Sequence, residues 1–146
     1  MAWNRQSYRH HSISGELEME RVVPVLQIDD YQQACDFYVK GLGFSIEFEH
    51  RHEPGFPVFM GIRKGDLYFH LSEHGKGHVG TEAYVFVDDI QAWYERCQAN
   101  GIATETPPEP KPWGNTDMPL KDPFRNLLRF SQTGTHEGQS TPNKKT

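Results

Sequence analysis

The sequence predicts an α+β fold in which two βαβββ modules form a curled mixed sheet around an enclosed cleft. An apolar strand-like run, an Asp-Asp pair, an amphipathic helix and a closing glycine occur twice in that order, and each copy precedes short β-rich runs. The 146 residues suffice for one compact domain, which buries about two thirds of its unfolded-chain surface. We therefore predict one domain built from a duplicated module.

The repeat is clearest in "VPVLQIDDYQQACDFYVKGLGF", from Val23, and "EAYVFVDDIQAWYERCQANGI", from Glu82. The pairs Asp29-Asp30 and Asp88-Asp89 align at an offset of 59 residues. Carboxylates at helix starts accept hydrogen bonds from free N–H groups and favour the positive end of the helix dipole. We therefore expect both helices to begin at these pairs. Glycines in the left-handed conformation commonly end helices, and those at the predicted exits are Gly41, Gly43 and Gly101.

Three short β-rich runs follow each predicted helix. In the first half they are "FSIEFEH", "PVFMGIRKG" and "LYFHLSE", and in the second "ATETP", a run near "NTDMPLKD", and "NLLRFSQ". The last runs keep the offset of 59, since His70 meets Arg129. Each four-stranded sheet needs one face covered. We expect the helices to cover the outer faces and the two sheets to curl around a shared ligand cleft.

The two ends of the chain lack this periodicity. We assign residues 1–19 to an N-terminal arm and residues 20–132 to the folded domain, with modules at about 20–78 and 79–132. Residues 133–146 are polar and have the composition of a disordered tail.

Composition limits the class of partner. Lys and Arg number 15 against 20 Asp and Glu, a net charge of −5, whereas nucleic-acid binding requires a basic stripe. The acidic surface favours a cationic partner, although ordinary solubility charge explains it equally well. Cys35 and Cys97 fall in predicted helices and suit buried thiols in a reducing compartment. Without a run long enough to span a membrane or a signal segment, we expect a cytoplasmic protein with no membrane partner.

Motifs for covalent catalysis are missing from the sequence. There is no Gly-x-Ser-x-Gly elbow and no glycine-rich phosphate loop, and neither cysteine has an evident histidine partner. The paired aspartates are better explained as helix caps. His50 and His52 share one strand face, while His70, His74 and His78 precede or lie among glycines. We favour surface histidines on polar loops over a metal site for this group, and we predict no catalytic residue.

Aromatic side chains are the best candidates for binding a ligand. Phe56 in "HEPGFP" and Trp113 in "PWG" lie on corners stiffened by proline, where a ring can stack on a flat ligand at little ordering cost. The alternative for Trp113 is that it caps the end of the core. Phe48, Phe59 and Tyr68 are candidates for lining the cleft. Phe44 and Phe48 alternate with polar residues, so for these two we favour the core beneath the helices over a ligand-binding role.

Four stretches together resemble the bleomycin resistance proteins of the glyoxalase/dioxygenase (vicinal oxygen chelate) superfamily. They are "DFYVKGLGF", "RKGDLYFHLSEHG", "ERCQANGI" and "PWGNTDMPLKDPFRNLLRF". The resemblance implies a homodimer with two ligand clefts at the subunit junction, and a drug that is sequestered rather than destroyed. It also implies acidic, aromatic clefts that suit the positively charged tail of the drug, with Trp113 facing it.

Superfamily enzymes hold a divalent metal at four positions, and the resemblance maps these to Val23, His70, Glu82 and Arg129. Valine cannot ligate, and arginine carries only donors and a permanent positive charge. We therefore predict no metal and no cofactor, and expect Glu82 and Arg129 to neutralise each other. The family usually has Asp-Gly in the closing turn where this chain has Phe124-Arg125, so we expect a different or strained turn.

The predicted function is stoichiometric capture of a bleomycin-type glycopeptide by a homodimer without cofactor. The ligand-binding residues we predict are Trp113, Phe56, Phe59, Tyr68, His70, Glu82 and Arg129. One alternative is a metal-dependent lyase, isomerase or dioxygenase acting on a small metabolite, with a metal held by His70, Glu82 and one further group. Another is that the natural ligand is a different planar metabolite.

Overall fold

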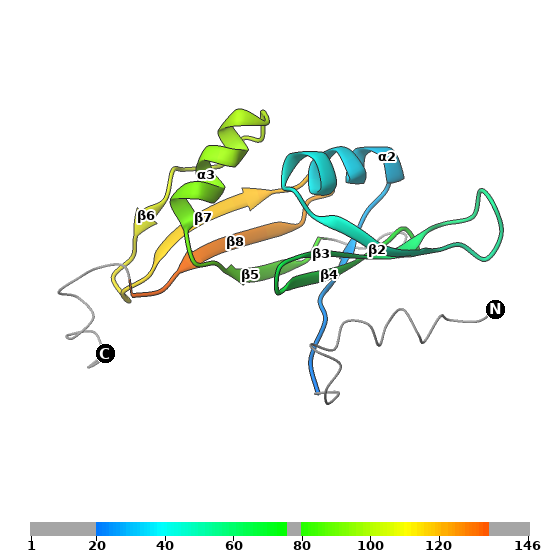
Figure 1. The fold of residues 1–146 in the computed structure, drawn as a ribbon, viewed down its shortest axis with the longest axis horizontal. Helices are drawn as coiled ribbons and strands as arrows, with labels where there is room; N and C mark the ends of the chain where they lie inside the picture. Colours follow the sequence, from blue (N-terminus) through cyan, green and yellow to red (C-terminus); the bar gives the residue numbers. More distant parts are fainter. Residues whose placement is uncertain (1–19, 76–79, 135–146) are drawn as a thin grey trace.

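The computed structural model describes residues 20–75 and 80–134, which form two separate four-stranded mixed sheets and two helical segments (Figure 1). The first sheet has the order β1-β4-β3-β2, with β1 Val25–Gln27, β4 Leu67–Ser72, β3 Phe59–Lys64 and β2 Ser45–His50. The second has the order β5-β8-β7-β6, with β5 Glu82–Phe86, β8 Leu127–Gln132, β7 Thr116–Lys121 and β6 Glu109–Pro110. The α+β class and the duplicated strand–helix–strand–strand–strand order are confirmed.

The helices begin where the paired aspartates predict. Asp30 accepts a hydrogen bond from the backbone N–H of Gln32, at 3.0 Å, before α2 (Tyr31–Ala34), which continues as the π-helical segment η2 (Cys35–Gly41). Asp89 accepts one from Ala92, also at 3.0 Å, at the start of α3 (Ile90–Ala99). Figure 1 shows these helices on the same side of the two sheets. Each sheet therefore has one face that no helix of residues 20–75 and 80–134 covers.

Strand register confirms the repeat. β1 runs parallel to β4 with Val25 opposite His70, and β5 runs parallel to β8 with Tyr84 opposite Arg129. Both residues of the second pair follow those of the first by the predicted 59 positions. The first module closes β3–β4 with the two-residue turn Gly65-Asp66, whereas the second needs the three residues 123–125 between Asp122 and Asn126. This extra residue is a difference between the modules, and it affects how they pack.

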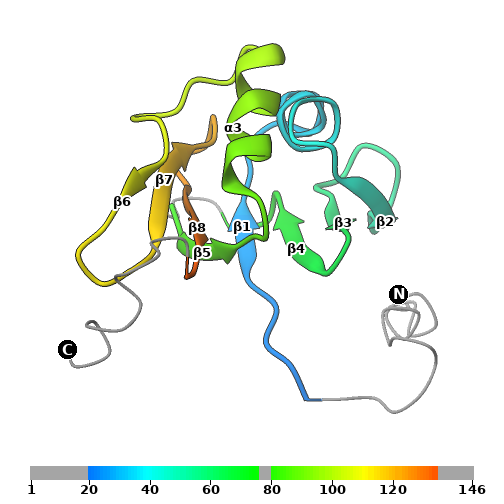
Figure 2. The same ribbon diagram turned by 60° about the vertical axis from the view of Figure 1, so that its left-hand side comes forward.

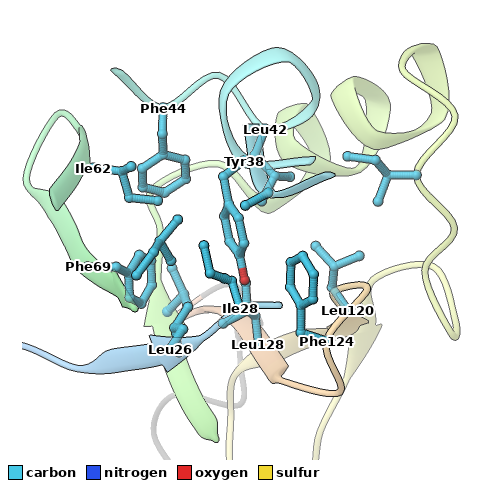
Figure 3. Close-up of a cluster of buried hydrophobic side chains, with 14 of the residues drawn as sticks. Leu26, Ile28, Tyr38, Leu42, Phe44, Ile62, Phe69, Leu120, Phe124 and Leu128 are labelled. Carbon is cyan, nitrogen blue, oxygen red and sulfur yellow. The ribbon is translucent and has the colours of Figure 1, made fainter. Parts of the chain in front are cut away.

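The core lies between the helices and the sheets. Figure 3 shows Tyr38 at its centre, among Leu26, Ile28 and Phe69 of the first module and Leu120, Phe124 and Leu128 of the second. Most of these side chains are almost completely buried, and each contributes about 1.5–3 kcal/mol relative to exposure. The Tyr38 hydroxyl donates to the Asp122 carboxylate at 2.6 Å. Burial first, and then this carboxylate, raise the pKa of Tyr38.

The turn between β7 and β8 joins the modules. Asp122 accepts from the backbone N–H groups of Phe124 and Asn126, each at 2.8 Å. The Asn126 side-chain amide donates to the Gln27 carbonyl at 2.9 Å and accepts from the Thr81 N–H at 2.8 Å. Arg125 has a φ of 71°, in the left-handed region that favours glycine. The unusual turn expected from Phe124-Arg125 is present.

Three sequence-based expectations differ from the structure. The sheets are separate and open, so the described part of one chain does not form one sheet curled around an enclosed cleft. The "ATETP" run is not a strand, because residues 103–104 have no regular structure, residues 105–107 form a bend, and β6 follows at Glu109–Pro110. Phe48 is not beneath the helices, because a bulge in β2 turns it to the other face.

The predicted arm, and the tail beyond residue 134, lie outside the described residues. Within those residues, no helix is long and apolar enough to cross a membrane.

Candidate ligand-binding face

Four rings gather on the face of the first sheet that points away from the helices. We call Phe48, Phe59, Tyr68 and His70 the aromatic cluster. The His70 ring centre lies 4.9 Å from that of Phe59, 5.2 Å from that of Tyr68 and 5.6 Å from that of Phe48. Their strand neighbours Met60, Phe69 and Leu71 point into the core, because successive side chains alternate between faces. The predicted residues Phe59, Tyr68 and His70 are thus brought together.

A bulge in β2 and a glycine in β3 shape the aromatic cluster. Ile46 pairs with Ile62, but Phe48 pairs with Gly61, so the register shifts by one between them. This shift turns Phe48 away from the core, and the prediction of a core Phe48 was wrong because simple alternation ignored the bulge. A Cβ on Gly61 would lie 2.6 Å from both a Phe48 ring carbon and the Tyr68 hydroxyl oxygen. Glycine at this position therefore lets both rings lie over the strand.

His70 is buried, with 6% of its surface exposed, rather than on a polar loop as we expected for the histidines. Its Nε2 lies 3.1 Å from the Tyr68 hydroxyl. His50 ends β2, and the His52 ring lies 5.9 Å from that of Phe56 in the following loop. His78 lies outside the described residues. Of the described histidines, His70 is the one enclosed by aromatic rings on a sheet face.

Among the described residues, two arginines lie beside the aromatic cluster. The Arg63 guanidinium lies 4.7 Å from the Tyr68 ring centre, and that of Arg21 lies 5.2 Å from it. Glu47 is 3.6 Å from Arg63. Glu49 instead accepts a 2.6 Å hydrogen bond from Tyr31, which raises the pKa of that tyrosine. In the part of the chain that the structure describes, this face is therefore aromatic, with two arginines over the Tyr68 ring.

The face of the second sheet without a helix carries the predicted ion pair. Arg129 Nε donates to Glu82 Oε2 at 2.6 Å, and this hydrogen bond raises the pKa of Arg129. Beside the pair, the Tyr84 and Phe86 rings are stacked, with centres 5.7 Å apart and about half of each residue exposed. Asp117 is buried and accepts from the Ser131 hydroxyl at 2.6 Å.

The four mapped metal positions do not form a ligand set. Arg129 presents donors, and one of them occupies an oxygen of Glu82. In residues 20–75 and 80–134, no group of three or more His, Cys, Asp or Glu side chains is placed to hold a metal ion.

Phe56 and Trp113 are exposed, at 45% and 56% of their surfaces, but they are not near each other. Phe56 lies in the loop between β2 and β3, and Trp113 lies in the turn between β6 and β7. Figure 1 shows these two segments at opposite ends of the molecule. One chain therefore separates the predicted residues into an aromatic cluster, an ion pair and two exposed rings.

Sequence analysis missed Gly61, Tyr84 and Phe86 as candidates for these faces. The signal for Tyr84 and Phe86 was available, since both alternate with the buried Val85 and so share the face of Glu82. Gly61 had no local signal, because the two rings that exclude a side chain there come from other strands.

Known proteins are similar to this chain in sequence and in fold. The family described as "Glyoxalase superfamily protein" matches residues 8–137. A bleomycin resistance protein from Klebsiella pneumoniae is 28% identical over 123 residues, covering 77% of this chain and 92% of the relative. A bleomycin-binding protein complexed with bleomycin is 27% identical, with a TM-score of 0.64 over 79% of this chain and 99% of that one. The bleomycin-binding protein of Streptomyces verticillus complexed with copper(II)-bleomycin is 29% identical, with a TM-score of 0.61 over 83% and 100% of the two chains.

Proposed function

The chain belongs to the glyoxalase superfamily, and on that premise we propose that it captures a bleomycin-type glycopeptide and holds it without chemical change. The aromatic cluster, on the face of the first sheet opposite the helices, is the observation that carries the proposal. Each ring that stacks on a planar group contributes about 0.5–1.5 kcal/mol beyond its buried area. Similarity to bleomycin-binding proteins supports the same class of ligand.

We propose that the working unit is a homodimer. The aromatic cluster and Trp113 belong to different sheets and lie at separated places in one chain. A second copy that apposes its second sheet to the first sheet of this chain would bring both kinds of ring to one ligand. The exposed apolar side chains near the inner edges of the sheets, Val22, Val25, Tyr84 and Phe86, suit burial against such a copy.

The chemistry of the second sheet supports capture without turnover. A metal-dependent reaction on this fold requires ligands at the position of Arg129, and a guanidinium both repels a divalent cation and occupies Glu82. The Glu82–Arg129 pair instead offers a carboxylate oxygen and several N–H donors to polar groups of a ligand. Both cysteines are free thiols, which fits our assignment to the cytoplasm.

Calorimetric titration of metal-free bleomycin into the purified full chain tests the proposal. We expect one drug per chain, and saturation once the sites are filled. Trp113→Ala should weaken binding by about tenfold, because one stacking surface is lost. Gly61→Ala should weaken it as well, since the new methyl group displaces Phe48 and Tyr68.

The matched control is Gln98→Ala, which changes an exposed side chain on α3, on the helix-covered side of the sheets. It should leave the titration unchanged. Recovery of chemically altered drug, or stoichiometric divalent metal retained by the purified protein, would contradict capture without chemistry. Absence of heat with folded protein would exclude bleomycin as the ligand.

A further inference from the structure

A pocket of about 670 Å³ lies between the β3–β4 turn and the beginning of α3. Its wall includes Leu67, Phe86, Trp93 and Arg96, and Lys64 extends over it. This volume is within the usual range of small-molecule sites. It is distinct from the aromatic cluster, which lies on the face of the first sheet that has no helix. Of its wall, the proposed function uses only Phe86, at the proposed dimer interface.

The pocket has no counterpart in the other half of the repeat, because side chains fill the corresponding place there. There, Tyr38, Asp122, Phe124 and Asn126 pack and hydrogen-bond against the end of β1, and we call this the closed junction. At the offset of 59 residues Asn126 corresponds to Leu67, which has no polar group to bridge the strands. We call the place around Leu67 the open junction.

Two further differences leave fewer and smaller side chains to fill the open junction. Tyr38 corresponds to Cys97, whose side chain is much smaller. The longer turn of the second module places Phe124 in the core, whereas the shorter turn of the first has Gly65-Asp66, both exposed. A Cβ on Gly65 would meet no atom within 4 Å, which shows how much space surrounds this turn.

A positively charged side chain already lies over the Trp93 ring. Lys64 Nζ lies 5.5 Å from its ring centre, a distance at which an ammonium is attracted by the ring quadrupole. The other side of Trp93 packs against Phe130, with ring centres 5.0 Å apart. The indole is thus fixed by the core and offers a platform to the pocket.

Three carboxylates also line the pocket, those of Asp66, Asp88 and Asp89. Asp66 and Asp88 are exposed, and Asp89 caps α3 through its bond to Ala92. The wall also includes a second cation, Arg96 on α3. Its Nε donates to the carbonyl of Leu42, the residue after η2, at 3.1 Å. We propose that this pocket is a second binding site, for a planar organic cation that displaces Lys64 and stacks on Trp93, with its charge towards Asp66 and Asp88.

Two probes with the same ring and opposite charges test the site. They are naphthalene-2-carboxamidine, a cation, and naphthalene-2-carboxylate, an anion, each titrated calorimetrically into the full chain at neutral pH. We expect one amidine per chain, bound about tenfold more tightly than the carboxylate, from the cation–π and carboxylate contacts together. Equal or tighter binding of the carboxylate would overturn the proposal.

Substitutions locate the probe. Ala92→Trp fills the pocket and should abolish amidine binding, while Ala99→Trp, an equal change at the other end of α3, should not. Lys64→Met should tighten amidine binding by about fivefold, because the competing ammonium is gone. Asp66→Asn with Asp88→Asn should weaken it.

Thermal unfolding confirms that each variant is folded. If Ala92→Trp is not, Lys64→Met decides, since tighter binding supports the site and unchanged or weaker binding overturns it. Gly61→Ala, which disturbs the aromatic cluster, should leave amidine binding unchanged. Loss of amidine binding in Gly61→Ala would place the probe on the aromatic cluster and would also overturn the proposal.

Discussion

The closed and open junctions share a backbone frame, yet one is part of the core and the other is a pocket. Figure 2 shows the two halves from a second direction, with β1 and β5 near the middle of the molecule. Helix caps and strand register repeat between the halves. The difference lies in a few side chains and one extra turn residue. Duplication therefore preserved the frame, while side-chain size and hydrogen-bonding capacity decided which junction is solid.

The largest expected effect comes from breaking the closed junction at Asp122. Asp122→Ala removes the acceptor for the Tyr38 hydroxyl, two backbone N–H groups and the Asn126 amide. Leaving buried donors unsatisfied should lower the free energy of unfolding by about 4 kcal/mol. Urea denaturation measures this. Asp66→Ala, in the exposed turn of the open junction, should leave the midpoint unchanged, and equal losses in both variants would contradict the comparison.

A smaller effect is expected when only the Tyr38 hydroxyl is removed. Tyr38→Phe keeps the ring but removes one of the two donors to Asp122 Oδ2, the other being the Asn126 amide, and should cost about 1–2 kcal/mol. The same variant should change the pH dependence of stability. Because the folded-state pKa of Tyr38 is raised, mainly by burial, the unfolded chain ionises first as pH increases.

The contribution of Tyr38 to stability is therefore present at neutral pH and is lost above about pH 10, where an unfolded tyrosine ionises. Urea midpoints at about pH 9 and about pH 11 should differ less in Tyr38→Phe than in the unmodified chain. Other groups with raised pKa values, such as Cys97 and Tyr31, contribute equally to both proteins and cancel. An identical pH dependence in the two proteins would show that Tyr38 is not the group responsible.

The smallest expected effects concern the two turns. Arg125 and Gly65 both have positive φ, 71° and 61° respectively. Arg125→Gly should relieve strain and stabilise the chain by about 0.5 kcal/mol, while Gly65→Ala should destabilise it by about 1 kcal/mol. Thermal unfolding measures both. Because a Cβ at Gly65 meets no neighbour, only the backbone conformation can account for its effect. Destabilisation by Arg125→Gly would show that the Arg125 side chain itself contributes.

Much of the fold could be predicted because its signals are local or repeated. Asp30 and Asp89 cap their helices through bonds that span two or three residues, and the offset of 59 follows from comparing the chain with itself. The Glu82–Arg129 pair was also predicted, from the metal positions that the family resemblance maps onto this chain. By contrast, the bulge that turns Phe48 outward depends on how β2 pairs with β3, and local alternation predicted the wrong face.

The sequence by itself determined the α+β class, the duplication and the helix starts, because periodicity and capping act over short distances. Only the tertiary structure decided which rings meet and which junction is filled. Phe56 and Trp113 have similar corner sequences but lie at opposite ends of the molecule. Tyr38 and Cys97 occupy equivalent helix positions, yet whether each fills its junction depends on partners far along the chain, such as Asp122 and Phe124 for Tyr38. Packing of distant segments sets these outcomes, and no local pattern contains that information.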